Sequence, residues 1–235
     1  MQYRRELKFI CSDFELEILR HRLSAILPHD AHQTGACYQI RSLYFDTPDN
    51  RCFHENLDGV NLRRKYRMRI YNASDALIRF EVKEKRNNLT RKTSAALTRA
   101  EADSLLCGEP FPCAKGGGAA LVRTVRSESS PLLAPAVIVE YERTAFVYPV
   151  GNVRITFDRN VSGSVRFCGF FADALPKIPA MPAGHHILEV KYDELLPDFI
   201  FHTLNLGSLT KTSCSKYALC RMACSCPGTP FMTGG

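Results

Sequence analysis

Two neighbouring segments of the chain alternate apolar and polar residues with a period of two, the pattern of a β-strand with one buried face. Residues 63–71, RRKYRMRIY, place a basic side chain at every second position. Residues 77–86, LIRFEVKEKR, repeat the pattern with one glutamate among the cations. The linker YNASDA between them predicts a hairpin turn. The two strands therefore present cations and one carboxylate on a shared face.

The same alternation predicts further strands whose polar face is also charged. They cover residues 5–10, 38–47, 137–148, 153–158 and 186–194, and residues 164–171 form a weaker candidate. Strands that face water usually mix Thr, Ser, Lys and Glu, whereas these repeat Arg or Lys with Glu interspersed. Such a face suits the inside of a closed antiparallel β-barrel of about eight strands, with a lumen that holds a polyanion.

Helices are predicted in the intervals between these strands. Ser12 with Glu15 and Thr98 with Glu101 form capping boxes, which mark the starts of two helices. A third helix is expected over residues 197–207 and a fourth over 213–223. Residues 109–135 are rich in Gly, Pro and Ser and predict a long connection with one helical turn. The expected fold class is α+β, with a single domain over 1–223 and a flexible tail over 224–235.

The charge of the chain is concentrated in one region. The net charge is +7, and residues 62–92 hold eleven Lys and Arg against three Asp and Glu. The rest of the chain holds twenty basic and twenty-one acidic residues. Because the excess lies on predicted strands, it favours a polyanionic partner such as a phosphate chain, a nucleotide, RNA or an anionic membrane.

Length and composition restrict the class of protein. The 235 residues are 45% hydrophobic and 23% charged, as in ordinary globular proteins. No apolar run is long enough for a transmembrane helix, and the first fifteen residues lack the apolar segment of a signal peptide, so none is expected there. The ten cysteines are expected to be reduced thiols in a cytoplasmic protein.

Short motifs occur along the chain in a recognisable order: RRELKF, YFDTPD, KYRMRIY, FEVKEK, YERTAF, RITFDRN, LEVKYDE and SKY. In this order the chain resembles the VTC domain of the vacuolar transporter chaperone polyphosphate polymerases, in a stand-alone bacterial form. That family belongs to the CYTH-like triphosphate tunnel metalloenzymes, so the resemblance implies a β-barrel tunnel with flanking helices. The resemblance extends from Arg4 to about Tyr217.

The resemblance also implies roles for particular residues. The cations expected to act on the reacting phosphates are Lys8, Arg67, Arg69, Lys83, Arg143 and Lys191. Further phosphate contacts are implied for Arg154, Ser215, Lys216 and Tyr44. Metal binding of Mn²⁺ or Mg²⁺ is implied for Glu189, with Glu6 and Glu81 as supporting acids. Many tunnel phosphatases begin with ExExK, whereas this chain reads Arg4-x-Glu6-x-Lys8, which fits a polymerase better than a simple triphosphatase.

The leading hypothesis is metal-dependent transfer of phosphate from ATP to inorganic polyphosphate. The alternatives are a tripolyphosphatase or nucleoside triphosphatase in the same tunnel, a non-catalytic polyphosphate-binding module and, last, an RNA-binding protein. An inward-facing cation surface suits a slender chain and does not admit a nucleic acid duplex. The residues do not separate synthesis from hydrolysis, and they leave open the oligomeric state and a membrane partner.

Overall fold

A single antiparallel sheet forms the centre of the molecule. The computed structural model describes residues 5–31, 33, 35–87, 89–108, 117–128 and 133–225. Within them the strand order is β10-β1-β9-β7-β6-β2-β3-β4-β5, and β8 pairs with β7. The strands are β1 (Arg5–Ser12), β2 (Tyr38–Asp46), β3 (Leu62–Tyr71), β4 (Ser74–Arg86), β5 (Leu89–Leu97), β6 (Ala134–Tyr148), β7 (Val153–Ser164), β8 (Ile178–Pro179), β9 (His185–Tyr192) and β10 (Thr210–Lys211).

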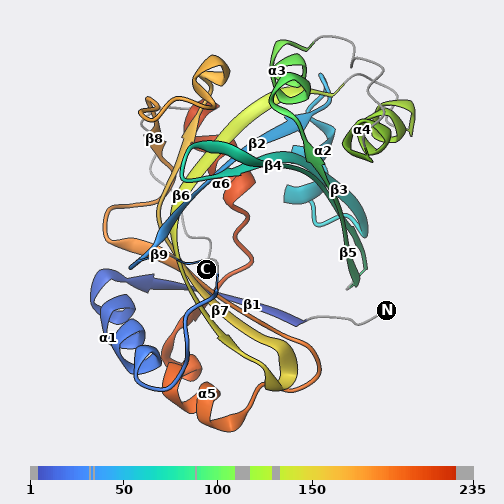
Figure 1. Cartoon of the computed structure of the whole chain (residues 1–235). Helices are drawn as coiled ribbons and strands as arrows, with labels where there is room; N and C mark the ends of the chain where they lie inside the picture. Colours follow the sequence, from blue (N-terminus) through green and yellow to red (C-terminus); the bar gives the residue numbers. More distant parts are fainter. Residues whose placement is uncertain are drawn as a thin grey trace.

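The sheet is strongly curved but open, so the prediction of a closed barrel was wrong. Figure 1 shows the strands bending into a curve, with β5 and β1 on either side of its opening. In the described residues β5 pairs only with β4, and the opposite edge ends in the two-residue strand β10. Closure would require a backbone ladder between these edges. Here the Nζ of Lys83 on β4 lies 3.4 Å from a carboxylate oxygen of Glu6 on β1, so a side-chain ion pair spans the gap.

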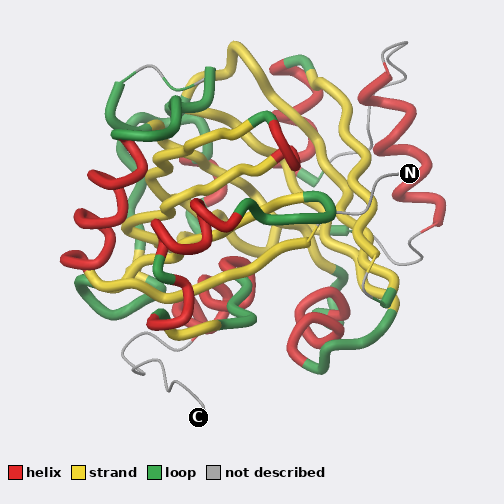
Figure 2. Tube along the Cα trace, turned by 90° about the horizontal axis from the view of Figure 1, so that it is seen from below, coloured by secondary structure: helices red, strands yellow, loops and turns green. Residues whose placement is uncertain are grey.

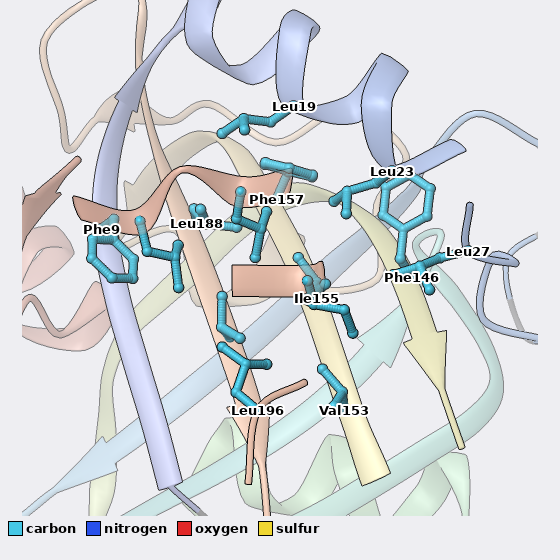
Figure 3. Packing of buried hydrophobic residues seen from close by; sticks show 14 of the residues in the cluster. Phe9, Leu19, Leu23, Leu27, Phe146, Val153, Ile155, Phe157, Leu188 and Leu196 are labelled. Carbon is cyan, nitrogen blue, oxygen red and sulfur yellow. The ribbon is translucent and has the colours of Figure 1, made fainter. Parts of the chain in front are cut away.

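Helices cover the outer, convex face of the sheet. The helices α1 (Asp13–Ser24) and α5 (Asp198–Leu204) pack against β1, β7 and β9, where Leu19 and Leu23 lie over Phe157 and Leu188 (Figure 3). The helices α3 (Arg99–Cys107) and α4 (Gly117–Glu128) cover β2, β3 and β4 through a second core. The view in Figure 2 shows the strands lying side by side across the middle of the molecule. The apolar positions of these two cores therefore face outward, toward the helices.

The last helix lies on the other, concave face. The helix α6 (Lys216–Ser225) packs against β6 and β7, and Figure 1 shows it within the curve of the sheet. Its Tyr217 is buried, stacks on Tyr44 of β2 and donates a hydrogen bond to Asp46. Asp46 also accepts the backbone N–H groups of Cys52 and Phe53 at the start of α2 (Arg51–Leu57). These contacts fix the first turn of α6 against the sheet.

Most predicted elements are present, with a few differences. Both capping boxes are formed, and α3 ends at Gly108, whose φ of 70° suits glycine. Residues 164–171 are not a strand, because β7 ends at Ser164 and the short 3-10 helix Phe167–Gly169 follows. The connection 109–135 contains the twelve-residue α4 instead of one turn. The strand β5 and the helix α2 were not predicted.

The domain prediction placed a single domain over 1–223 and a flexible tail over 224–235. The described sheet and helices pack as one body through shared cores, and α6 extends to Ser225. Residues 226–235 lie outside the described part of the chain. The eight cysteines within the described part are unpaired.

Candidate functional site

A buried group of three charges lies on β6, β7 and α6. Arg143 faces Asp158 in the strand register and donates two hydrogen bonds to its carboxylate, at 2.6 and 2.7 Å. The Nζ of Lys216 lies 2.6 Å from the same carboxylate, which is fully buried. Burial alone would raise the pKa of Asp158, but Arg143 and Lys216 hold it below its ordinary value. One anion thus orients two cations on the concave face.

The second group joins β1 and β9. Glu189 lies opposite Lys8 in the register, and Glu6 lies opposite Lys191. The Nζ of Lys191 is 3.2 Å from Glu189, and the Nζ of Lys8 is 3.1 Å from Glu6. Burial would raise the pKa of Glu189, yet the charges of Lys191, Lys216 and Lys8 hold it well below its usual range. Arg143 approaches Glu189 to 3.7 Å, which connects this group with the first.

Burial lowers the pKa of Lys191 to about 8, although Glu189 and Glu6 act in the opposite direction. The charge of this ammonium group is therefore only partly compensated by the protein. A phosphate anion beside Lys191 would restore the compensation and favour its charged form.

The third group lies on β3, β4 and β5. Arg67 donates a hydrogen bond of 2.6 Å to Glu81 and one of 3.0 Å to the hydroxyl of Tyr44. The Nζ of Lys92 is 2.6 Å from Glu81, and Arg69 approaches the same carboxylate to 3.7 Å. Burial would raise the pKa of Glu81, but these three cations lower it to about 2. Glu81 is therefore a fixed anion that positions cations.

Two lysines, Lys65 and Lys83, lie between these groups. Lys65 faces Lys83 across β3 and β4, and Lys83 contacts Glu6 of β1 at 3.4 Å. The Nζ of Lys65 donates a 2.9 Å hydrogen bond to the hydroxyl of Ser215, just before α6. Burial together with the nearby charges of Lys8 and Lys83 holds the pKa of Lys65 well below its ordinary value. The two neighbouring lysines therefore favour binding of an anion between them.

Arg154 lies at the margin of this surface. It pairs with Asp30 and donates a 3.2 Å hydrogen bond to the hydroxyl of Tyr38. In the register Arg154 faces Lys191, so both side chains point to the concave face. The structure thus brings together the cations and acids that the sequence singled out, on one face of one sheet: Glu6, Lys8, Arg67, Arg69, Glu81, Lys83, Arg143, Arg154, Glu189, Lys191 and Lys216, with Tyr44 and Ser215 among them.

Lys92 and Lys65 are charged groups that were not assigned to the site from the sequence. Lys92 lies on β5, whose sequence LTRKTSAAL contains few large apolar residues and therefore gave no clear strand signal. Its alternation of Thr90, Lys92 and Ser94 was the available indication. Alternation placed Lys65 on the same face as Arg67 and Arg69, but the sequence gave it no individual role in the site. Asp158 was expected as one of the acids that offset the repulsion between these cations, and it lies between Arg143 and Lys216.

The fold and this surface define a class of protein: an open, curved antiparallel sheet whose concave face carries an excess of ordered cations, as polyanion binding requires. The chain belongs to the VTC domain family, whose model matches residues 3–224. This match confirms the family that the sequence motifs suggested. Among curated proteins, no sequence matches this chain.

Several solved structures are similar to this chain at low sequence identity. A candidate adenylate cyclase from Bacillus halodurans superposes with a TM-score of 0.52 at 16% identity, over 92% of this chain and 94% of that chain. A protein from Pyrococcus horikoshii gives a TM-score of 0.47 at 12% identity, over 92% and 97%. A Mimivirus capping enzyme triphosphatase gives 0.37 at 11% identity, over 88% of each chain. At these identities the likeness concerns the fold alone.

The family and the charged face support an activity on polyphosphate or a triphosphate, by phosphate transfer or by hydrolysis. The part of the chain that the structure describes contains no helix long and apolar enough to cross a membrane.

Proposed function

We propose that the concave face binds ATP and a linear polyphosphate and transfers the terminal phosphoryl group of ATP to the polyphosphate. In this reaction the P–O bond to ADP breaks, a P–O bond to the terminal oxygen of the chain forms, and ADP leaves. Phosphoryl transfer requires positioning and charge stabilisation more than covalent help from the protein. The observation that carries the proposal is the excess of ordered cations over carboxylates along one continuous face.

The cation groups act in this proposal as positioning groups for adjacent phosphates. Arg143 and Lys216 are held in place by Asp158, and Arg67 is held by Glu81 and Tyr44. Because these partners are buried, the cations need little reorganisation when a phosphate oxygen arrives. Burial lowers the pKa of Lys191 and of Lys65, so the charged forms of these two side chains gain the most from an arriving phosphate.

Glu189 and Glu6 are the residues that fit a divalent cation. They lie on the paired strands β1 and β9 of the concave face, and carboxylate oxygens are ligands that a divalent cation prefers. Mg²⁺ is commonly held by one or two carboxylates together with substrate phosphates. The described residues contain no cluster of three His, Cys, Asp or Glu, so in the proposal the substrate phosphates supply the remaining ligands.

A bound Mg²⁺ or Mn²⁺ would polarise the phosphoryl group and neutralise part of its charge. Glu81, which the resemblance also assigns to the metal, contacts Arg67, Arg69 and Lys92. In the proposal its task is to hold these cations in position.

Synthesis is placed ahead of hydrolysis because of the sequence Arg4-x-Glu6-x-Lys8, in which an arginine replaces the first glutamate of many tunnel phosphatases. Arg4 itself lies outside the described residues. Tripolyphosphate or nucleoside triphosphate hydrolysis requires the same cations and the same metal, and it is the second candidate.

The test is incubation of the protein with ATP and Mn²⁺, with ADP, orthophosphate and polymer measured separately. We expect ADP together with a polymer that an exopolyphosphatase digests. Orthophosphate without polymer would show that the protein hydrolyses its substrate. If neither polymer nor orthophosphate forms, the protein would be a non-catalytic binding module. Lys8→Ser removes a cation of the concave face and should stop turnover. Arg64→Ser removes a cation from the opposite face, where Arg64 pairs with Glu84, and should leave turnover unchanged.

A further inference from the structure

Like charges face each other at one end of β3 and β4. Going from the middle of the strands toward their joint end, the register pairs Lys65 with Lys83 and then Arg63 with Lys85. On the next strand Lys92 lies opposite Lys83. Directly opposed like charges destabilise an antiparallel pair, so this arrangement has a cost in the absence of a ligand.

The other face of the same two strands is arranged in the opposite way. Arg64 lies between Arg63 and Lys65 in the sequence and faces Glu84 in the register. The two form an ion pair with a nitrogen–oxygen distance of 2.7 Å. A basic surface that merely faces water has no reason to pair charges on one face and oppose them on the other. At this end of β3 and β4, positive charge is therefore uncompensated on the concave face and paired on the opposite face.

This unbalanced segment continues the phosphate-binding surface toward the solvent. Arg69 is nearly buried at 8% exposure, whereas Lys83 further along has an exposed side-chain fraction of 36%, and Arg63 and Lys85 are half-buried. Burial, and after it the charges of Arg63 and Lys83, lowers the pKa of Lys85. Successive residues on one face of a strand are roughly 7 Å apart, so these pairs extend the row of cations by two steps.

We propose that Arg63, Lys65, Lys83 and Lys85 form a track along a long polyphosphate chain, in which Lys65 and Lys83 still reach a bound triphosphate and Arg63 and Lys85 bind the part of the chain beyond it. Arg63 and Lys85 are its outer pair, and only a chain longer than a triphosphate reaches them. The choice of polyphosphate as the ligand of the track rests on the proposed function. A linear, flexible polyanion can follow a row of half-buried cations, whereas a folded duplex cannot enter it.

The test compares binding of a long-chain polyphosphate with binding of tripolyphosphate, both without ATP. For Arg63→Ser combined with Lys85→Ser we expect affinity for the long chain to fall roughly tenfold. We expect affinity for tripolyphosphate to be unchanged. The slope of log affinity against log salt for the long chain should become shallower by about 1.4, at about 0.7 per lost contact, the value for single-stranded nucleic acids.

The single variant Arg63→Ser is measured beside its matched control Arg64→Ser, which removes one arginine from the same strand but from the opposite face. Arg64→Ser should leave both affinities unchanged. Equal loss for long and short chains, or equal loss in Arg64→Ser and Arg63→Ser, would overturn the track, because the effect would then be one of net charge. Single-stranded RNA that binds the wild-type protein as tightly as polyphosphate, with the same dependence on Arg63 and Lys85, would also overturn it.

The outcome is distinguishable from failure of the proposed function, because binding is measured without turnover. If the protein makes no polymer from ATP but the double variant still loses long-chain affinity alone, the track remains and only synthesis is lost. If the protein makes polymer and the double variant binds long chains normally, the synthesis proposal remains and the track is refuted.

Discussion

Replacing Asp158 by asparagine tests the electrostatic basis of the site most directly. This fully buried carboxylate accepts two hydrogen bonds from Arg143 and contacts Lys216 at 2.6 Å. Asn keeps the size of the side chain but removes the negative charge. Among the described residues, Arg143 would retain Glu189, at 3.7 Å, as its nearby anion, and Lys216 would lose the carboxylate that it contacts at 2.6 Å.

The expected loss of stability is large. Removing one partner of a buried ion pair leaves an uncompensated charge and costs about 3–5 kcal/mol. For a protein of this size each kcal/mol corresponds to about 2–4 °C, so the melting temperature should fall by about 6–20 °C. A triphosphate supplies new anions beside the two cations, so it should raise the melting temperature of Asp158→Asn more than that of the wild type.

The pH dependence has a definite sign. The pKa of Asp158 is below its ordinary value in the folded protein, because Arg143 and Lys216 outweigh the effect of burial. The carboxylate therefore contributes stability above its unfolded pKa of about 3.9, and this contribution is lost as the pH falls through the folded pKa. Asp158→Asn should accordingly lose less stability than the wild type when the pH falls below about 4.

The assay is thermal and urea unfolding with and without tripolyphosphate, at neutral pH and along the acid limb. Asp103→Asn serves as the control, because Asp103 forms an exposed ion pair with Arg99 on α3 and its removal should cost at most about 1 kcal/mol. If Asp158→Asn unfolds within about 1 kcal/mol of the wild type, the reasoning that this carboxylate holds the two cations is refuted.

Three further predictions concern binding and turnover. Glu189→Gln should reduce Mn²⁺-dependent turnover by more than about tenfold, while metal-free triphosphate affinity stays equal or improves, because a repelling carboxylate is removed; undiminished turnover would exclude Glu189 from the site. Lys83→Ala should weaken triphosphate binding by about one to two powers of ten, measured by calorimetry, since a charge-assisted phosphate contact contributes about 1.5–3 kcal/mol; an unchanged affinity would place Lys83 outside the binding surface. Triphosphate affinity should fall as the pH rises above about 8, where free Lys191 loses its proton, and Lys191→Arg should shift this fall to higher pH.

The sequence by itself determined the local elements and the faces of the strands. Alternation placed Lys65, Arg67 and Arg69 on one side of β3, and the register confirms that they share this face. Capping boxes fixed the starts of α1 and α3. These features depend on residues that are close in the sequence, so they can be predicted without knowledge of the fold. The order of the charged motifs was also enough to identify the family.

Only the tertiary structure decided which charges meet and how the sheet ends. Asp158 is 15 residues from Arg143 and 58 from Lys216, and strand pairing together with the packing of α6 brings the three together. The closed barrel failed for a related reason: closure depends on whether two distant edges form a ladder, and β5 and β10 do not. Long-range pairing is set by register and by the packing of whole elements, which no local pattern contains.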